Sequence, residues 1–590
     1  MYTQNSDYGH WTSVQIVAYF SKLSAMRRPA TLVFFCVCFY VQSVLSYSRF
    51  IIHRSKPTSN LQLRNSGRQD DSSLISEIKF ALQSRPDEEP LLFNLGMLLG
   101  QKVDGLAPGN LSERKSLIDE ALTFFSKAVK INDKRDASWY NIASLKQQAG
   151  DSHGAMLAYR QTIRITESND VLSACYSNLV QLLLEKGDLD EAAIVSNQAV
   201  NALPDDSTAW TNMGIVLREN QSYEWAVLCF ENAVKFSDGI NAVALNNLGN
   251  IHLQNNEADK AYSAYSRALQ ADPSDEASAY SLAMLLRDSG DQEASKKMFE
   301  QCVVINPANS AAAFQLAALS GSSNFEQCPS DYVADLFDHY AKKGYDTHMV
   351  SNLKYRVPDY LWDAFKSSTP LRTKTTPLVI VELGAGTGLV GSRFRAGLSE
   401  MSCGSDNYQV DEFTACDLSQ EMIMRAYELM YVPASSSESS NTEAVTSSLE
   451  DAEQEENVYT DVVISDCTEY LLNRATQGAA SADLILAGDV LVYIGNLDPL
   501  FSSVKASLSG LGEDSGRFIF SVEKLIGEDA NGGFSLQESA RFAHTKEYVV
   551  DALSKAGMEV VSCTEHPLRY DGGNEVNGYV FVAQKLSCII

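Results

Sequence analysis

Positive charge is scarce in this sequence. Its 590 residues include 47 lysines and arginines against 75 aspartates and glutamates, which gives a formal net charge of −28 at pH 7. Neutralisation of phosphates by basic side chains supplies most of a protein's non-specific affinity for nucleic acid. The composition therefore predicts no nucleic-acid partner, and the length predicts about two to four domains.

Cysteines in metal-binding or disulfide patterns are also missing. The chain has 11 cysteines, but no C-x-x-C pair and no cluster of Cys and His at zinc-site spacing. We therefore expect reduced, mostly buried thiols, no disulfide framework and no metal centre.

The apolar run near the N-terminus, residues 31–45, is shorter than the about 20 residues that a membrane-spanning helix needs. Arg27 and Arg28 precede it and small residues follow it, an arrangement typical of a secretory signal. An uncleaved signal anchor, which would hold the protein at a membrane, is the alternative. Met26 stands directly before the arginines, so the sequence leaves open whether translation begins at Met1 or Met26.

Residues 49–68 carry arginine, lysine and several serines but no acidic residue, a composition typical of transit peptides. A signal followed by such a segment resembles the bipartite presequence of proteins imported into complex plastids. We therefore predict that residues 1–75 are a targeting segment. It would direct the chain to the secretory pathway, and the resemblance implies onward import into a complex plastid.

From about residue 88 to 318 the chain repeats itself at a period near 34 residues, as tetratricopeptide (TPR) repeats do. Small residues recur on the expected first helix of each unit, and a small residue followed by an aromatic one recurs on the second. The first-helix positions are Gly96, Ala143, Val180, Gly214, Gly249 and Ala283, and the second-helix pairs include Ala155/Tyr159, Ala226/Phe230 and Ala261/Tyr265. The pattern predicts a helical TPR solenoid over residues 76–320. The resemblance implies a groove that binds a protein partner or substrate.

A glycine-rich loop follows the apolar run Leu378–Val381, which predicts a buried strand. Glu382 is followed by glycines at 384, 386 and 388, which let the backbone turn sharply and approach a ligand closely. A dinucleotide-binding G-x-G-x-x-G does not fit directly after the strand, and a P-loop would need a Gly-Lys-Ser/Thr ending. The pattern E-x-G-x-G-x-G resembles motif I of class I S-adenosylmethionine (AdoMet) methyltransferases. A dinucleotide loop or another glycine-rich turn is the alternative.

Acidic residues end the next predicted strands. Asp417 stands about thirty residues after the glycines, where a carboxylate suits hydrogen bonds to both ribose hydroxyls, or else caps a helix. Position in the resembled fold assigns Asp466 and Cys467 to the adenine amino group, and Met422 to packing against adenine. Asp489 ends the following strand, where ligands of an open α/β sheet sit.

Further segments resemble a group of TPR-containing predicted methyltransferases. They are the helices expected over 331–366, the D-L-I-L-A-G-D-V-L-V-Y stretch from 483, and S-A-R-F-A-H from 539. The resemblance implies that Tyr340 and Tyr345 of a lid cover AdoMet, although they also suit the core of a capping helix. The Asn-Pro-Pro-Tyr signature of many DNA methylases is absent. We predict an α/β Rossmann-like methyltransferase domain over 329–590, with a mostly parallel seven-stranded sheet and an antiparallel last strand.

Two further expectations concern disorder and chemistry. Residues 434–457, rich in Ser, Glu and Thr, predict a disordered insertion. Methyl transfer mainly needs alignment and removal of a proton, so His544, then Tyr493 and His348, are the candidate catalytic residues. A lone histidine also serves often as a structural hydrogen-bonding residue. We expect an AdoMet-dependent methyltransferase that acts on a protein or a small molecule. The alternative is a TPR adaptor with an inactive methyltransferase-like domain.

Overall fold

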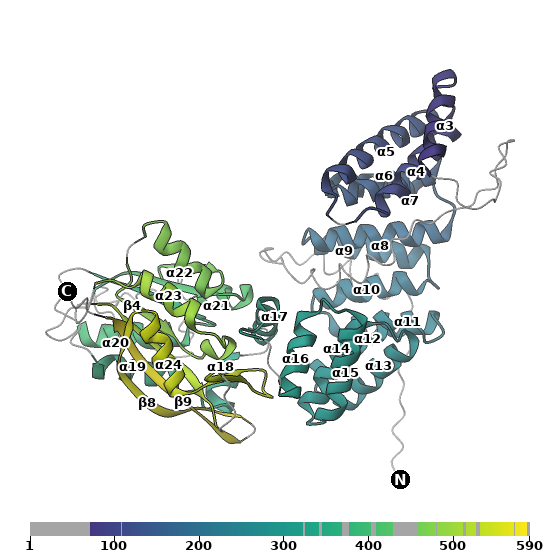
Figure 1. The fold of residues 1–590 in the computed structure, drawn as a ribbon. Helices are drawn as coiled ribbons and strands as arrows, with labels where there is room; N and C mark the ends of the chain where they lie inside the picture. Colours follow the sequence, from purple (N-terminus) through teal and green to yellow (C-terminus); the bar gives the residue numbers. More distant parts are fainter. Residues whose placement is uncertain are drawn as a thin grey trace, which may run out of the picture. The chain divides into compact units, whose positions relative to one another are not determined.

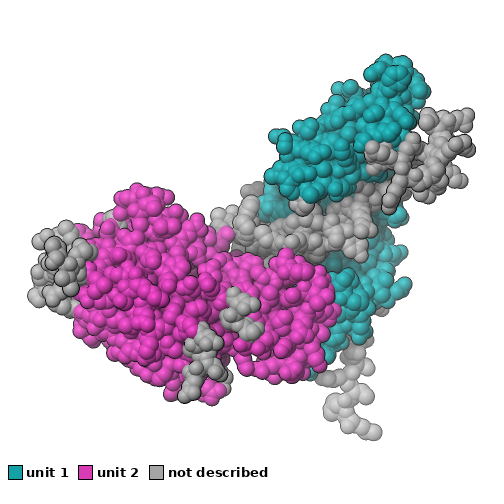
Figure 2. Space-filling model, viewed as in Figure 1, with its two compact units in different colours: residues 1–285 teal, residues 286–590 magenta. Residues whose placement is uncertain are grey.

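The computed structural model describes residues 71–107, 109–321, 325–341, 345–368, 377–402, 409–428, 458–479, 481–510, 515–526, 532–571 and 573–586. The chain forms two compact units, Met1–Leu285 and Leu286–Ile590 (Figure 2). The predicted targeting segment 1–75 lies outside the described residues, except for its last few positions, and so does the insertion 434–457. No helix within the described ranges is long and apolar enough to cross a bilayer.

The first unit is built from consecutive antiparallel helix pairs (Figure 1). Each pair makes one repeat, and helix N-termini are capped by Asp or Asn in several repeats, as at Asp188 and Asn241. The helices are α3 (Asp71–Ser84), α4 (Glu89–Asp104), α5 (Leu111–Ile131), α6 (Asp136–Gln148), α7 (Ser152–Ile165), α8 (Asn169–Glu185), α9 (Leu189–Ala202), α10 (Ser207–Glu219), α11 (Tyr223–Phe236), α12 (Ala242–Gln254), α13 (Ala258–Ala271) and α14 (Glu276–Asp288).

The small residues of the repeats lie where the sequence predicts close helix packing. A Cβ atom added to Gly96 would lie 2.9 Å from the Phe125 ring, one on Gly214 2.6 Å from the Phe230 ring, and one on Gly249 2.4 Å from the Tyr265 ring. All three rings are fully buried. The aromatic residue of the second helix therefore fills the space left by the glycine of the first, which confirms the predicted helical solenoid.

The second unit begins within α14 and includes the last helices of the array, α15 (Gln292–Ile305) and α16 (Ser310–Ser320). The sequence predicts that the array ends near residue 320, before a separate C-terminal domain. In the structure the last array helix, α16, packs directly against residues of that domain. Phe314 of α16 contacts the rings of Tyr332 and Phe542, and Gln315 donates a hydrogen bond to the Tyr332 hydroxyl at 2.8 Å. The final repeat thus shares a core with the domain that follows it.

A nine-stranded mixed sheet forms the centre of this unit. Five parallel strands have the order β3-β2-β1-β4-β5, β9 pairs antiparallel with β5, and β8 pairs antiparallel with β9. The short hairpin β6–β7 extends the end of β5. The strands are β1 (Leu378–Leu383), β2 (Val410–Asp417), β3 (Asp461–Ile464), β4 (Leu484–Ala487), β5 (Arg517–Lys524), β6 (Phe534–Leu536), β7 (Phe542–His544), β8 (Met558–Asp571) and β9 (Asn574–Lys585). The predicted parallel sheet with an antiparallel last strand is present, with two additional short strands.

Helices cover both faces of the sheet because side chains alternate along the buried strands. Leu378 and Ile380 face a core shared with α19 and α20, whereas Val379 and Val381 face a core shared with α23 and α24. The helices of this unit are α17 (Ser330–Ala341), α18 (Tyr345–Thr347), η1 (His348–Asn352), α19 (Val357–Ser368), α20 (Leu389–Ser402), α21 (Gln420–Glu428), α22 (Cys467–Thr476), η2 (Leu491–Tyr493), α23 (Asp498–Ser507) and α24 (Lys546–Lys555).

The strand order reverses at β1, which pairs with β2 on one side and β4 on the other. The loops that follow two such neighbouring strands lead to helices on opposite faces of the sheet. Open α/β sheets bind ligands in the crevice between these loops. The glycine-rich loop after β1 stands at this point.

Candidate functional site

The loop between β1 and α20 depends on its glycines. Gly384, Gly386 and Gly388 have φ angles of +60°, +56° and +88°, a region that residues with a side chain seldom adopt. A Cβ at Gly384 would lie 2.2 Å from Cγ2 of Val490, whereas one at Gly386 would meet no atom within 4 Å. Gly384 therefore permits close packing against the segment after β4, and Gly386 borders open space.

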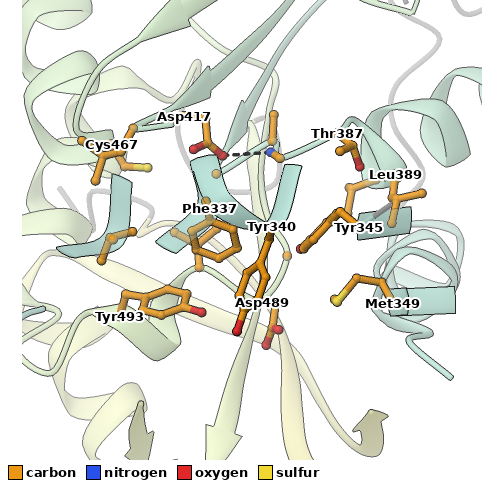
Figure 3. A pocket seen from close by; sticks show the side chains of 18 of the residues that line it. Phe337, Tyr340, Tyr345, Met349, Thr387, Leu389, Asp417, Cys467, Asp489 and Tyr493 are labelled. Carbon is orange, nitrogen blue, oxygen red and sulfur yellow. Dashed lines mark hydrogen bonds between the residues drawn. The ribbon is translucent and has the colours of Figure 1, made fainter. Parts of the chain in front are cut away.

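Asp417 at the end of β2 is buried and holds this loop. Its Oδ2 accepts a hydrogen bond from the Gly386 N–H at 2.8 Å, and Oδ1 accepts one from the Ser419 N–H at 2.9 Å (Figure 3). Burial raises the pKa of the carboxyl, and the backbone donors oppose that rise. The N–H that a dinucleotide loop would offer to a phosphate is donated here to a carboxylate.

Glu382, the last acid of β1, is 1 % exposed and accepts a hydrogen bond from the Tyr459 hydroxyl at 2.7 Å. Burial raises the pKa of its carboxyl to about 8, and the bond from Tyr459 only partly offsets that rise. Glu382 is therefore largely protonated in the folded protein at neutral pH.

Glu382 makes stability depend on pH. Its folded pKa lies above its unfolded pKa, so its contribution is complete below about pH 4.5 and disappears as pH rises to about 8. We expect the free energy of unfolding to fall by roughly 2 kcal/mol between pH 6 and pH 9 on account of this group, and Glu382→Gln to remove that fall. Urea unfolding at the two pH values measures it. An unchanged pH dependence in the variant would show that the folded carboxyl is ionised.

A cavity of about 240 Å³ opens beside the loop, at the carboxyl ends of β1, β2 and β4. Most residues that the sequence nominates for cofactor binding or catalysis meet here. Those that line the cavity are Tyr340, Tyr345, His348, Glu382, Gly384, Gly386, Asp417, Asp466, Cys467, Asp489 and Tyr493.

Aromatic rings from the segment before β1 cover the cavity. Phe337 of α17 lies at the centre of this cluster, with ring centroids 6.2 Å from Tyr340, 6.3 Å from Tyr345 and 5.5 Å from Tyr493. In the view of Figure 3, Phe337 and Tyr340 lie between Asp417 and Asp489, with Tyr493 and Tyr345 on either side. The faces of such rings attract a ligand that carries positive charge.

Two aspartates fasten this cover to the side of the cavity that contains Asp417 and the glycine-rich loop. Asp338 of α17 accepts hydrogen bonds from the Ser419 hydroxyl at 2.5 Å and the Glu421 N–H at 3.1 Å. Asp346 of α18 accepts a hydrogen bond from the Thr387 hydroxyl in the glycine-rich loop. The cover is therefore tied to both segments that hold Asp417.

Asp466 caps α22, because its Oδ1 accepts hydrogen bonds from the N–H groups of Thr468 at 2.9 Å and Glu469 at 3.1 Å. Cys467, the first residue of that helix, also lines the cavity. Their assignment to the adenine amino group stays a prediction.

Asp489, on the opposite wall of the cavity, lies beside charged residues to which the sequence analysis gave no role. Asp489 has φ +60°, and its carboxylate accepts from Nη1 of Arg569 at 2.9 Å. Nη2 of the same arginine donates to Glu523 at 2.6 Å. Arg541 lines the cavity nearby. Arg541 lies within the quoted S-A-R-F-A-H stretch and Arg569 on β8, and only the tertiary fold brings them together.

Three nominated residues do not line the cavity. Gly388 begins the turn into α20, and Met422 is fully buried in α21. His544 is also fully buried, and its Nε2–H donates to the backbone carbonyls of Ile494 at 2.9 Å and Gly495 at 3.2 Å. The nomination of His544 as a general base is therefore corrected, because its ring holds the loop after β4 and does not reach the cavity.

His544 gives a second pH-dependent prediction. Burial lowers the pKa of its imidazole to about 4, so its contribution to stability is complete above the unfolded value near 6.5 and is lost as pH falls toward 4. We expect His544→Gln to lose less stability than the wild type over that range. Thermal unfolding at pH 6.5 and 4.5 compares the two. An equal loss in both would mean that the ring is protonated in the folded state.

The remaining catalytic candidates, Tyr493 and His348, both line the cavity. Burial raises the pKa of the Tyr493 hydroxyl, although the charge of Arg541 and the hydrogen bond that it donates oppose the rise, so the hydroxyl is protonated at neutral pH. His348 is exposed, with Nδ1 3.1 Å from the Asn352 amide. No group of three or more His, Cys, Asp or Glu side chains within the described ranges is arranged to hold a metal ion.

Comparison with known proteins identifies the repeats. Models of the tetratricopeptide repeat match residues 242–275 and 277–309. The anaphase-promoting complex subunit 6 of Dictyostelium discoideum is 27 % identical over 120 residues, which is 20 % of this chain and 13 % of that protein. This chain thus contains TPR repeats, and it spans a small part of the curated relative.

Solved TPR structures are similar to the repeat region. The APC/C hetero-tetramer Cut9–Hcn1 is 16 % identical with a TM-score of 0.32, covering 42 % of this chain and 46 % of that one. A tetratricopeptide repeat protein of Parabacteroides merdae is 13 % identical with a TM-score of 0.33, covering 42 % and 93 %. BtubC of P. vanneervenii is 21 % identical with a TM-score of 0.29, covering 34 % and 92 %. Scores of this size carry no conclusion, and the repeats are shown by the family models.

Proposed function

We propose that the C-terminal unit is an AdoMet-dependent methyltransferase. The observation that carries the proposal is the loop of Gly384 and Gly386, held by buried Asp417 at the switch point of the sheet. Acidic side chains and aromatic rings line the cavity beside it, which suits a cationic cofactor and disfavours the phosphates of a dinucleotide. These residues fit AdoMet, whose ribose, adenine and sulfonium would meet Asp417, Asp466 and the rings around Phe337, respectively.

AdoMet, when bound, supplies a methyl group on a sulfonium that is already a good leaving group. The protein's task is then to align the acceptor with that methyl group and to remove a proton where the acceptor carries one. His348 reaches the cavity from the cover and is the candidate base, since an imidazole nitrogen can accept a proton from the methyl acceptor. The protonated Tyr493 hydroxyl donates a hydrogen bond that orients the acceptor. The acceptor is a protein or a small molecule.

The TPR repeats support a protein-interaction role for the N-terminal unit. The curated relative is a subunit of an assembly, which agrees with such a role. We infer that the repeats bring a protein partner or substrate to the chain. The second candidate function is an adaptor whose C-terminal unit binds no cofactor. For location, we propose that residues 1–75 direct the chain to the secretory pathway and a complex plastid, or anchor it in a membrane through 31–45.

Calorimetric titration tests the proposed function. AdoMet and its demethylated product, S-adenosylhomocysteine, are titrated into the full chain, and each is expected to bind saturably at one site. A search with AdoMet labelled in its methyl group then identifies the acceptor. A folded chain that binds neither compound would contradict the enzyme and support the adaptor.

A further inference from the structure

Two arginines with different surroundings stand on the side of the cavity opposite Asp417: Arg541 lines the cavity, and Arg569 pairs with Asp489, which also lines it. Arg569 is 2 % exposed and forms direct ion pairs with Asp489 at 2.9 Å and Glu523 at 2.6 Å. These two bonds fix the carboxylates on β5 and after β4. Both nearby acids are therefore already engaged by one guanidinium.

Arg541 has no such partner. Its guanidinium donates a hydrogen bond to the Tyr493 hydroxyl and is attracted by the charges of Asp489 and Glu523, but among the described residues no carboxylate lies within ion-pair distance of it. Its side chain is half-buried and lines the cavity. A guanidinium presents five N–H donors in a planar fork, and burying them without acceptors is costly. Tyr493 engages one donor of Arg541, and the remaining donors, which have no carboxylate partner, suit an acceptor inside the cavity.

The backbone around Arg541 holds it in this place. The carbonyl of Arg541 accepts from the Gln537 N–H at 2.8 Å, and Ala540 before it has φ +59°. Phe542 after it packs against Phe314 and Phe534. A side chain that starts from so constrained a turn is pre-positioned and loses little freedom when it binds a ligand.

We propose that Arg541 is a specificity-determining residue that binds a carboxylate on the methyl acceptor through its planar fork. The proposal rests on the proposed function. It names the acceptor class as a molecule or side chain that carries a carboxylate beside the methylated atom. Arg541 belongs to the wall formed after β4 and β5, with Tyr493, whereas the groups suited to ribose and adenine come from β2 and the start of α22. Arg541 and Tyr493 together would hold the acceptor at the far side of the cofactor.

The methionine end of AdoMet also carries a carboxylate, so the experiment separates the two sources. S-Adenosylhomocysteine, which has that carboxylate, and 5′-methylthioadenosine, which lacks it, are titrated into the full chain. Acetate, succinate and benzoate are then titrated into the chain saturated with S-adenosylhomocysteine. The variants are Arg541→Met and Arg541→Lys, with Arg393→Met as the control, because Arg393 is half-buried in the same unit but outside the cavity.

We expect a carboxylate to bind the saturated wild type, and Arg541→Met to weaken it about ten- to a hundred-fold, the loss of a charge-assisted hydrogen bond. Arg541→Lys should retain part of the affinity, and both nucleoside affinities should stay unchanged in all variants. A loss for S-adenosylhomocysteine but not for 5′-methylthioadenosine would assign the carboxylate to the cofactor and overturn the proposal. So would a wild type that binds the nucleosides but no carboxylate. A wild type that binds neither nucleoside would contradict the proposed function, and the carboxylate titration of the unliganded chain then decides the assignment of Arg541 by itself.

Discussion

Gly386→Asp is expected to abolish the binding of AdoMet and of S-adenosylhomocysteine, a loss of at least about a hundred-fold. Gly386 borders the cavity with φ +56°, and no atom lies within 4 Å of an added Cβ, so the new carboxylate would project into the space for the ligand. It would also stand next to the carboxylate of Asp417, which accepts the Gly386 N–H. Calorimetric titration of the full chain measures the effect.

Gly478→Asp is the matched control for this substitution. Gly478 also has a positive φ, +74°, with no atom within 4 Å of an added Cβ, but it follows α22 outside the cavity. Both variants carry a similar backbone penalty of about 1 kcal/mol. We expect the control to bind as the wild type does. Equal binding by all three proteins would show that the glycine-rich loop does not contact the ligand.

Arg569→Met is expected to cause the largest loss of stability in the C-terminal unit, about 3–5 kcal/mol. The guanidinium is 2 % exposed and joins Asp489 to Glu523, so its removal leaves two carboxylates with no counter-charge in direct contact. Hydrogen exchange of the amides in β4 and β5 measures the loss, because both acids stand at the ends of these strands.

Two further variants serve as controls for the stability loss in Arg569→Met. Arg393→Met removes a partly exposed pair with Asp359 at 3.1 Å and is expected to cost at most about 1 kcal/mol. Asp489→Asn combined with Arg569→Met removes one of the stranded charges and is expected to recover part of the loss. If Arg569→Met proved no more harmful than Arg393→Met, Arg541 or solvent would be compensating the two acids.

These predictions also separate fold from function. Gly386→Asp leaves the sheet intact and removes a ligand, whereas Arg569→Met weakens the sheet at the wall of the same cavity. The TPR repeats are shown by family models over residues 242–309, while the enzyme remains a proposal that stands on the cavity. An adaptor would tolerate both the loss of the cofactor and the Arg541 variants.

Local physical rules in the sequence determined much of this protein. The 34-residue period predicted the helical repeats, because a small residue recurs on the first helix of each unit where a large one packs from the second. Gly214, for example, faces the Phe230 ring. The apolar strand before Glu382 and the glycines after it predicted the position of the glycine-rich loop, because only glycine adopts a positive φ without cost. Acids at strand ends, such as Asp417, met in one cavity because parallel strands bring their carboxyl ends to one edge.

Tertiary structure alone decided the rest. His544 looked like a base by residue type, but burial and two backbone carbonyls make it a structural residue. Arg569 on β8 and Arg541 before β7 are far from Asp489 in the sequence. Arg569 pairs with Asp489, and Arg541 lines the same cavity, only because β7 pairs with β5 while β8 lies beyond β9. Side-chain packing between distant segments decides that Arg569 pairs with acids and that Arg541 faces the cavity. The periodicity and motif spacing of the sequence do not predict this difference.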